Sequence, residues 1–310
     1  MANHMISIIC PTYNSVNKMK NLLESIGRQN YDNYEVIFID DGSEDDTYTF
    51  LKKYSLTNKR IRVYRKSHEG PGPARKFGFL KSRGDLLFFI DSDDWIASFD
   101  SLMRMNDIFL REDIDICFTP RKIFPSNEIS LPFVNSAIEP GLYDLEIFRT
   151  SQIYGGMGMK IFRRSMFESD MFVGTCSFED LFTTYNYLAS CNNILYTDQI
   201  FQIVNHSMSN ESLTRSADYA EKSMRERLNM LVEMSRRKMP EPIKIILADT
   251  ALDVYCRLLI NRRKRNNDER KKVSILRKMI KTADLSGYLS GYSSKKKIVL
   301  LMIKHGRIRK

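Results

Sequence analysis

Carboxylate side chains that follow hydrophobic segments are the groups in this sequence best suited to carry chemistry. The hydrophobic run at 86–90 leads directly into Asp91, Ser92 and Asp93. Alternate carboxylates at a strand end can hold one hard divalent cation against a diphosphate, with phosphate and water oxygens completing the shell. A bare Asp-x-Asp pattern is weak on its own, because residues 113–115 also match it. That second copy lies at the start of a predicted strand, where we expect its acidic groups to face solvent or cap a turn.

Two further polar turns follow the first two predicted strands. The strand at 6–10 leads into Pro11, Thr12, Tyr13 and Asn14, and the strand at 34–39 leads into Asp40 and Asp41. Both turns fall at carboxyl ends, so we expect them on the same edge of a parallel sheet. A carboxylate there can accept a hydrogen bond from a base imide N–H, and backbone amides can hold ribose or phosphate. The alternative is an ordinary turn and helix cap, which Asp and Ser also favour.

Charged residues also occupy the first turns of two predicted helices. Glu179 and Asp180 open an amphipathic helix, and one of them can act as a general base that removes a proton from an acceptor hydroxyl. The alternative is helix capping, because the helix dipole favours acidic residues in the first turn. Arg75 follows a bend rich in glycine and proline, where a cation can approach a base or phosphates, although a surface role is the alternative.

The elements that must position these residues alternate regularly over the first 120 residues. Strands are predicted at 6–10, 34–39, 61–64, 86–90 and 115–118, and helices near 15–28, 44–55, 73–82 and 98–110. This succession predicts an α/β fold with a Rossmann-like, doubly wound, mostly parallel sheet. In such sheets, ligands bind beyond the carboxyl ends of the strands. Residues 120–145 carry prolines without a clear period and are predicted to be a connecting region near the acceptor.

The remainder of the chain becomes strongly helical and basic. Strands near 159–162 and 193–198 flank the helix at 179–189, and helices are predicted at 217–238, 243–264, 267–282 and 294–304. Residues 1–215 hold 23 basic and 28 acidic side chains, a net charge of −5, whereas residues 216–310 hold 25 and 10, a net charge of +15. We therefore predict a catalytic domain at 1–215 and a basic helical C-terminal region at 216–310.

This charge distribution limits the partners that we expect. An acidic first part argues against a general nucleic-acid-binding protein, whereas a basic tail suits an anionic surface such as a membrane. The segments at 261–272 and 295–310 combine cations with apolar residues, as helices that lie on a membrane surface do. The alternative is that their apolar residues pack on the core or in a subunit interface of a homo-oligomer.

The cysteines and the hydropathy of the chain indicate the cellular compartment that we expect. The five cysteines are widely scattered and show no metal-binding spacing, which predicts buried thiols in a reducing compartment. No window approaches the roughly 18 apolar residues that a membrane span needs, and the N-terminal residues lack the pattern of a signal peptide. The expected location is the cytoplasm, with peripheral association at the inner face of the plasma membrane.

Six motifs together carry a family resemblance. PTYN, IDDGSEDDT, GPGPARKFG, FFIDSDDW, MKIFRRSMF and FEDLF occur in this order between about residues 5 and 215. The series resembles family 2 glycosyltransferases with the GT-A fold. The resemblance implies a bacterial enzyme that uses a UDP-sugar to build capsule, teichoic-acid, lipopolysaccharide or exopolysaccharide glycans. Six ordered matches are far more specific than any one of them.

The resemblance also implies roles for individual residues. Thr12 and Asn14 would line the nucleotide pocket, Asp41 would contact uracil with Asp40 beside it, and Arg75 would bind the nucleotide. Asp91 and Asp93 would hold the metal and the diphosphate, with Asp93 the direct ligand, and Asp180 would be the catalytic base with Glu179 as its neighbour. His206 lies in a segment that resembles the family's loop after the last core strand, to which Ser212 and Arg215 also belong. An imidazole there can complete a metal shell or stabilise the leaving diphosphate.

These expectations combine into one mechanism with two rivals. An acceptor hydroxyl on a glycan, teichoic acid or lipid-linked molecule would attack the anomeric carbon while Asp180 takes its proton, with Mn²⁺ or Mg²⁺ on the diphosphate. A single displacement inverts that carbon. One rival is a sugar-phosphate nucleotidyltransferase, but the Gly-rich triphosphate loop that it needs after strand one is missing. The other is an inactive nucleotide-sugar-binding assembly protein, against which the presence of both Asp93 and Asp180 argues.

Overall fold

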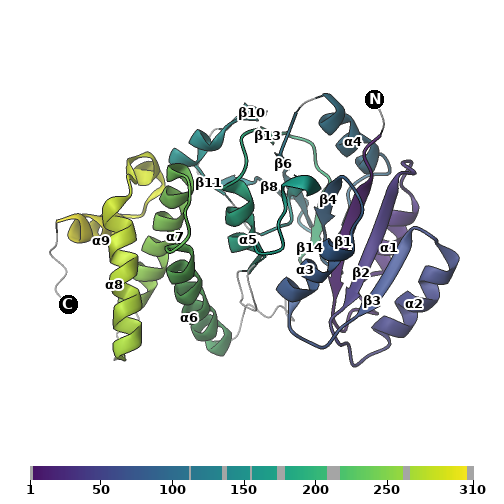
Figure 1. The fold of residues 1–310 in the computed structure, drawn as a ribbon, viewed down its shortest axis with the longest axis horizontal. Helices are drawn as coiled ribbons and strands as arrows, with labels where there is room; N and C mark the ends of the chain where they lie inside the picture. The colour runs from purple at the N-terminus through teal and green to yellow at the C-terminus, as the bar shows by residue number, and fades with distance from the viewer. Residues whose placement is uncertain are drawn as a thin grey trace.

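A computed structural model describes residues 3–111, 113–134, 138–153, 156–172, 179–207, 217–260 and 266–305. Figure 1 shows a part built around a sheet, which carries the N-terminus, and a group of C-terminal helices at the opposite end. The four parallel strands at 6–12, 34–40, 61–65 and 86–89 run from the side that carries the N-terminus towards the lower side of that view, so their carboxyl ends share one edge.

The main sheet has eight strands in the order β10-β13-β6-β12-β4-β1-β2-β3. In that order they span Gly141–Tyr143, Ile194–Tyr196, Ile116–Phe118, Lys160–Arg163, Leu86–Phe89, Ile6–Thr12, Tyr34–Asp40 and Ile61–Arg65. Strands β4, β1, β2 and β3 are parallel, as are β6 and β13, whereas β12 runs antiparallel to both of its neighbours. The predicted α/β fold with a mostly parallel sheet is confirmed.

Helices cover both faces of this sheet because its strands are hydrophobic on both sides. All seven residues of β2 are buried, and in β1 Ile9 joins one hydrophobic cluster while Ile8 and Cys10 join another. Since side chains of a strand alternate between faces, each continuous hydrophobic run supplies two cores. One core receives α3 (Pro71–Lys81) and α5 (Glu179–Leu188), and the other receives α1 (Lys20–Gly27), α2 (Thr47–Thr57) and α4 (Ser101–Arg111).

The region 120–145, predicted to be irregular, contains short strands instead. Strands β7 (Arg121–Phe124) and β8 (Ile129–Ser130) join β14 (Gln202–Asn205) and β5 (Trp95–Ile96) in a second sheet of order β5-β14-β7-β8. Strand β9 (Phe133–Val134) pairs with β11 (Gln152–Ile153), and β10 closes one edge of the main sheet. Strands of two to four residues are too short to produce a readable period. The second sheet brings residues after β14 close to the end of β4.

Four C-terminal helices extend the first core. Helices α6 (Ala217–Met234), α7 (Glu241–Ile260), α8 (Asn267–Thr282) and α9 (Ser294–Lys304) follow one another, and α9 has the predicted bounds. Ile246 of α7, Leu276 of α8 and Leu300 of α9 belong to the same hydrophobic cluster as Ile9 of β1. Short 3-10 helices occupy Leu145–Arg149 (η1), Arg164–Met166 (η2) and Ser286–Gly291 (η5). Within the described ranges, no helix combines the length and hydrophobicity that crossing a bilayer requires.

The cysteines of the described part of the chain are free thiols. Cys10, Cys117 and Cys191 are buried and Cys256 is half-buried, whereas Cys176 lies outside the described residues. Burial raises the pKa of Cys256, and it raises the pKa of Cys10 well above its ordinary value. These thiols are therefore poor nucleophiles. The burial of Cys10, Cys117 and Cys191 agrees with the prediction of buried thiols.

Candidate active site

The turns after β1 and β2 are tied together by Asn14. Its backbone adopts a left-handed conformation with φ of 46°, which asparagine tolerates better than most residues. Its N–H donates to Ser43 Oγ at 3.0 Å, and its Oδ1 accepts from the N–H of Glu44 at 2.9 Å. The neighbouring Thr12 is buried and its hydroxyl donates to the carbonyl of Ile39 at 3.3 Å. These predicted nucleotide-site residues therefore fix the shape of one edge of the sheet.

Asp41 organises the loop that leads into α3. Its buried carboxylate accepts from the N–H of Glu69 at 3.1 Å and of Gly70 at 2.8 Å, and Lys66 Nζ lies 2.9 Å away. The ring of His68 stacks on the exposed ring of Tyr13 with centroids 4.2 Å apart. Asp41 thus holds the loop at 66–70 in place, and it lies beside an exposed aromatic surface suited to stacking a base. Its predicted contact with uracil stays a prediction.

Asp40 lies fully buried beside Asp41. Its Oδ2 accepts from the N–H of Ser43 at 3.3 Å and faces Arg65 Nε at 3.2 Å. Its Oδ1 is buried and has no hydrogen-bond partner among the described residues. Since buried polar atoms are rarely left unpaired, this oxygen is a candidate contact for a ligand or an ordered water.

The predicted metal and diphosphate motif follows β4. Asp91 is mostly exposed, Ser92 donates to Ser15 Oγ at 2.9 Å, and Asp93 is half-buried. Burial and the neighbouring Asp91 carboxylate raise the pKa of Asp93, whereas Lys18 and His206 act to lower it. His206 therefore lies within electrostatic reach of Asp93, although the two residues are 113 positions apart in the chain. The role of Asp91, Asp93 and His206 as metal ligands stays a prediction.

Asp94, which we did not select from the sequence, explains how His206 reaches this place. Its buried carboxylate accepts from the Gln202 side chain at 2.6 Å and from the N–H of Asn205 at 3.0 Å, both in β14. The N–H of His206 then donates to the carbonyl of Phe124 at 2.8 Å. Burial raises the pKa of Asp94 to about 8, which agrees with a structural role in a dry location. Ser212 and Arg215 lie outside the described residues.

Arg75 connects the two acidic motifs. Its Nη2 donates to Asp91 Oδ1 at 2.8 Å, and its Nη1 donates to Oε1 of the buried Glu179. Burial acts to lower the Arg75 pKa, but Asp91 and Glu179 outweigh it and raise that pKa above its ordinary value. Burial raises the pKa of Glu179 to about 7 against the lowering effect of Arg75. The guanidinium therefore fixes the start of α5 against the end of β4. Its predicted contact with the nucleotide stays a prediction.

Asp180 fits into a space that only a glycine can leave open. Its Oδ1 accepts from the N–H of Leu181 at 2.7 Å. A Cβ placed on Gly156 would lie 1.5 Å from Asp180 Oδ2, which is far shorter than any permitted contact. Asp180 is therefore positioned by the segment before β12 as well as by its own helix.

A buried lysine holds that segment. Lys160 of β12 is fully buried, and its Nζ donates to the carbonyls of Gly156 at 2.5 Å and Gly158 at 3.2 Å. Burial lowers the pKa of Lys160 to about 7, and Asp180 opposes this shift. The lysine thus contributes positive potential near Asp180. Neither Gly156 nor Lys160 was selected from the sequence, because the lysine interrupts an ordinary hydrophobic strand and its partners lie in the preceding loop.

The donor set fits a divalent ion that a substrate helps to hold. In the part of the chain that the structure describes, no group of three or more His, Cys, Asp and Glu side chains is placed to hold a metal ion. Asp91, Asp93 and His206 offer oxygen and nitrogen ligands, and the pKa of Asp93 is raised first by burial and then by the neighbouring Asp91 carboxylate. Mg²⁺ and Mn²⁺ are commonly held by one or two carboxylates together with phosphates and water.

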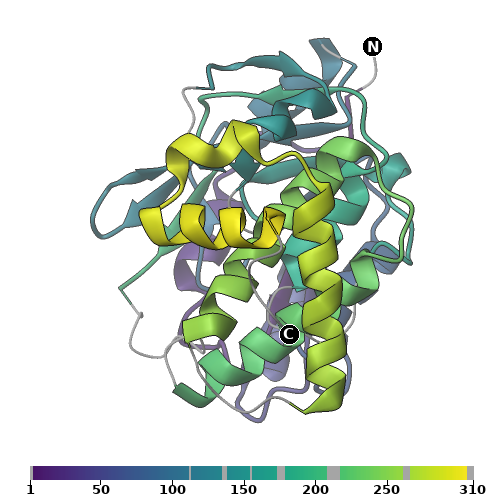
Figure 2. The same cartoon turned by 90° about the vertical axis from the view of Figure 1, so that its left-hand side faces the viewer.

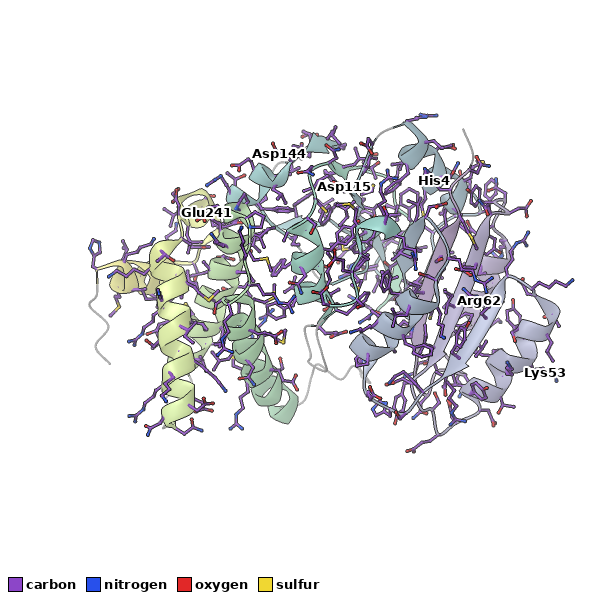
Figure 3. All side chains as sticks on the ribbon, in the orientation of Figure 1. His4, Lys53, Arg62, Asp115, Asp144 and Glu241 are labelled. Atoms are coloured by element: carbon purple, nitrogen blue, oxygen red, sulfur yellow. The ribbon has the colours of Figure 1, made fainter. Side chains whose placement is uncertain are left out.

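The second Asp-x-Asp copy lies at the opposite edge of the sheet. Asp113 is exposed, and Asp115 Oδ2 accepts from the N–H groups of Asn192 at 2.7 Å and Asn193 at 3.0 Å. Figure 3 places Asp115 and His4 on the same upper side of the view, where β6 and β1 begin. The expectation that this copy faces solvent or caps a turn is confirmed.

The sheet, its second small sheet and the acidic residues along its carboxyl edge define a glycosyltransferase with the GT-A fold. The signature of Glycosyl transferase family 2 matches residues 7–170, more than half of the chain. The chain belongs to this family.

Individual relatives support this assignment. An uncharacterized glycosyltransferase of Rickettsia bellii is 42% identical over 89 residues, which are 29% of this chain and 13% of that protein. A solved structure of Staphylococcus aureus TarS 1–349 in complex with UDP-GlcNAc has a TM-score of 0.69 at 20% identity, covering 99% of this chain and 93% of that one. The mannosyltransferase PcManGT of Pyrobaculum calidifontis, solved with GDP-Man and Mn²⁺, has a TM-score of 0.52 at 13% identity, covering 100% and 82%. The chain spans about half or less of the length of the curated relatives that it matches.

Proposed function

We propose that the chain is an inverting, metal-dependent glycosyltransferase that uses a UDP-sugar, with Asp180 as its general base. The observation that carries this proposal is the bridge from Asp91 through Arg75 to Glu179. This bridge connects Asp91, which belongs to the motif suited to a metal and a diphosphate, to the first turn of α5, which also carries Asp180. A donor and an attacking hydroxyl need this arrangement, because the leaving group and the base must lie on opposite sides of one carbon.

The proposed reaction is a single displacement. The acceptor hydroxyl oxygen forms a bond to the anomeric carbon while the bond from that carbon to the UDP oxygen breaks, and the hydroxyl proton passes to the Asp180 carboxylate. Lys160 contributes positive potential near Asp180, and Gly156 leaves room for its carboxylate. A divalent ion held by Asp91, Asp93 and His206 would neutralise charge that develops on the diphosphate. The base contributes about 10²- to 10⁴-fold to the rate.

The nucleotide would bind along the edge formed by β1 and β2. Pro11, Thr12, Tyr13, Asn14, Asp40 and Asp41 would hold the base and ribose, with Tyr13 and His68 offering a stacking surface. The solved complexes of TarS with UDP-GlcNAc and with UDP support the choice of a UDP-sugar. A hexose or N-acetylhexosamine would pass to a glycan, teichoic acid or lipid-linked acceptor, as the name of TarS, poly(ribitol-phosphate) beta-N-acetylglucosaminyltransferase, suggests.

The organisation of the whole chain is part of the same proposal. Residues 1–215 would form the catalytic domain and 216–310 a helical region that closes its core. The enzyme would act in the cytoplasm, and the helical region would also be the place for any contact between copies.

Release of UDP from a panel of UDP-sugars, with and without Mn²⁺ or Mg²⁺, tests the proposal. We expect metal-dependent release with at least one donor, and Asp180→Asn should keep UDP binding while losing transfer by about 10²-fold or more. Near wild-type turnover of Asp180→Asn would remove Asp180 from the base role. Release of pyrophosphate from UTP and a sugar phosphate would instead identify a nucleotidyltransferase. Absence of both reactions with every donor and metal would support an inactive binding protein.

A further inference from the structure

The structure distinguishes two basic helices that look alike in the sequence. Helix α8 turns its apolar residues Val273, Leu276 and Ile280 inward and buries all three. Helix α9 buries Leu300 and Ile303 but leaves further large apolar side chains outside. The basic helix α8 is therefore an ordinary amphipathic helix whose apolar face is satisfied, whereas α9 has two apolar faces and only one is covered.

The exposed apolar face of α9 is a stripe of three side chains. Ile298 is 56% exposed, Leu301 is 57% exposed and Met302 is 37% exposed. Their spacing of three and four residues places them side by side on one face of a helix. We call Ile298, Leu301 and Met302 the α9 stripe. Scattered exposed apolar residues are normal, but three adjacent ones on a single turn form a contiguous patch.

Cations surround the α9 stripe and leave it no acidic neighbour on its own helix. Lys295 is exposed one turn before Ile298, and Lys297 is half-buried beside it. Two other lysines of α9 serve the fold instead: Lys296 pairs with Asp249 and Asp253 at 2.8 Å, and Lys304 donates to backbone carbonyls. Helix α8, which packs on α9, adds exposed cations at Arg270, Lys271, Lys278 and Lys281.

The position of α9 makes the stripe accessible. In Figure 1 α8 and α9 lie at the end of the molecule opposite α2 and β3. Figure 2, turned to face that end, shows α9 in front of the other helices, and none of the elements with described placement lies over it. A flat surface could therefore approach α9 without meeting the loop that carries Asp91 and Asp93 or the start of α5, which carries Asp180.

We propose that the α9 stripe docks this protein onto an anionic lipid bilayer. The apolar side chains would enter the boundary between headgroups and acyl chains, and the surrounding lysines would face lipid phosphates. A second copy of the chain is a poorer occupant, because residues 216–310 carry a net charge of +15 and two such surfaces repel each other. A bilayer supplies the apolar layer and the negative charge together, which a nucleic acid does not.

Flotation with vesicles tests this surface independently of any enzymatic activity. The probes are vesicles of phosphatidylcholine alone and vesicles that also contain about 30% phosphatidylglycerol. We expect the full chain to float only with the anionic vesicles, and added salt should weaken this binding. Flotation that is equal with both vesicles, or absent with both, would overturn the proposal.

Variants of exposed residues locate the binding surface. Ile298→Ser with Leu301→Ser should reduce the association constant by about tenfold or more, because two apolar anchors are lost. Lys295→Glu with Lys297→Glu should do the same for anionic vesicles while leaving the stripe intact. The matched control is Leu56→Ser on α2, which removes a leucine that is 80% exposed outside the α9 stripe. Equal flotation of the stripe variant and this control would overturn the proposal.

The same variants separate a bilayer from a second copy. Light scattering after gel filtration should give one mass for the wild type and for Ile298→Ser with Leu301→Ser. A wild-type dimer that the stripe variant dissociates would overturn the proposal and assign the stripe to an interface between copies. The melting temperatures of all variants should stay close to that of the wild type, because each changed side chain lies at least partly in solvent.

Discussion

Replacing Gly156 with alanine should displace the Asp180 carboxylate while residue 180 itself stays an aspartate. An alanine Cβ at position 156 would lie 1.5 Å from Asp180 Oδ2 and 2.1 Å from its Cγ. Real Cβ contacts essentially never fall below 3.0 Å, so the carboxylate must move by about 1.5 Å. The backbone of Gly156 does not need a left-handed conformation, so the substitution acts through this collision and not through backbone strain.

The size of the expected effect follows from the role proposed for Asp180. A displacement of about 1 Å at a reacting group can cost about 10²-fold in rate, and the whole contribution of a base is about 10²- to 10⁴-fold. We therefore expect kcat of Gly156→Ala to fall by about 10²-fold or more, which corresponds to about 2.7 kcal/mol of lost transition-state stabilisation. Binding of UDP should change little, because the nucleotide residues lie along β1 and β2.

Two measurements, a control variant and a double variant test this prediction. Steady-state release of UDP gives kcat, and calorimetric titration gives the affinity for UDP. Gly158→Ala is the matched control, since its Cβ would come no closer than 3.2 Å to any neighbouring atom, the nearest being Gln202 Oε1. Adding Gly156→Ala to Asp180→Asn should cause almost no further loss, because both changes act on one group. A folded Gly156→Ala protein with wild-type kcat, or losses that multiply in the double variant, would refute the reasoning.

Further predictions concern charge, pH and metal. Arg75→Met would leave the buried Glu179 carboxylate without its cationic partner. We therefore expect the free energy of unfolding to fall by about 3–5 kcal/mol and the melting temperature to fall with it. An unchanged melting temperature would contradict this. Burial lowers the Lys160 pKa to about 7 from 10.5, so the unfolded chain binds more protons above pH 7 and folding becomes more favourable as the pH rises. Relative to Lys160→Met, the wild type should gain about 2 kcal/mol between about pH 7 and about pH 9, and parallel profiles of denaturant unfolding would argue against a buried, titrating lysine. EDTA should abolish UDP release, and added Mn²⁺ or Mg²⁺ should restore it. Asp93→Asn should raise the metal concentration that gives the half-maximal rate by about tenfold or more. Activity that is insensitive to EDTA would remove the metal from the mechanism.

The α/β fold could be predicted because it depends on local patterns. The hydrophobic runs that became β1, β2 and β4 are buried on both faces, and such runs are readable in the sequence without knowledge of their partners. Chain direction then places the residues that follow them, from Pro11 to Asn14 and from Asp91 to Asp93, on one edge. Short strands such as β8 and β9 escaped prediction, because two residues carry no period.

Residue types and their order along the chain were thus enough to establish the fold class, the acidic edge and the family. Tertiary structure alone decided which groups meet: Arg75 reaches Glu179 across 104 positions, Asp94 brings β14 and His206 to Asp93, and Gly156 opens the space for Asp180. The tertiary structure also decided that α8 buries its apolar face, whereas α9 leaves an apolar face exposed. The physical reason is that the hydrophobic periodicity of a segment indicates only which of its side chains face the core and which face solvent. Contacts between distant segments depend on how the sheets and helices pack.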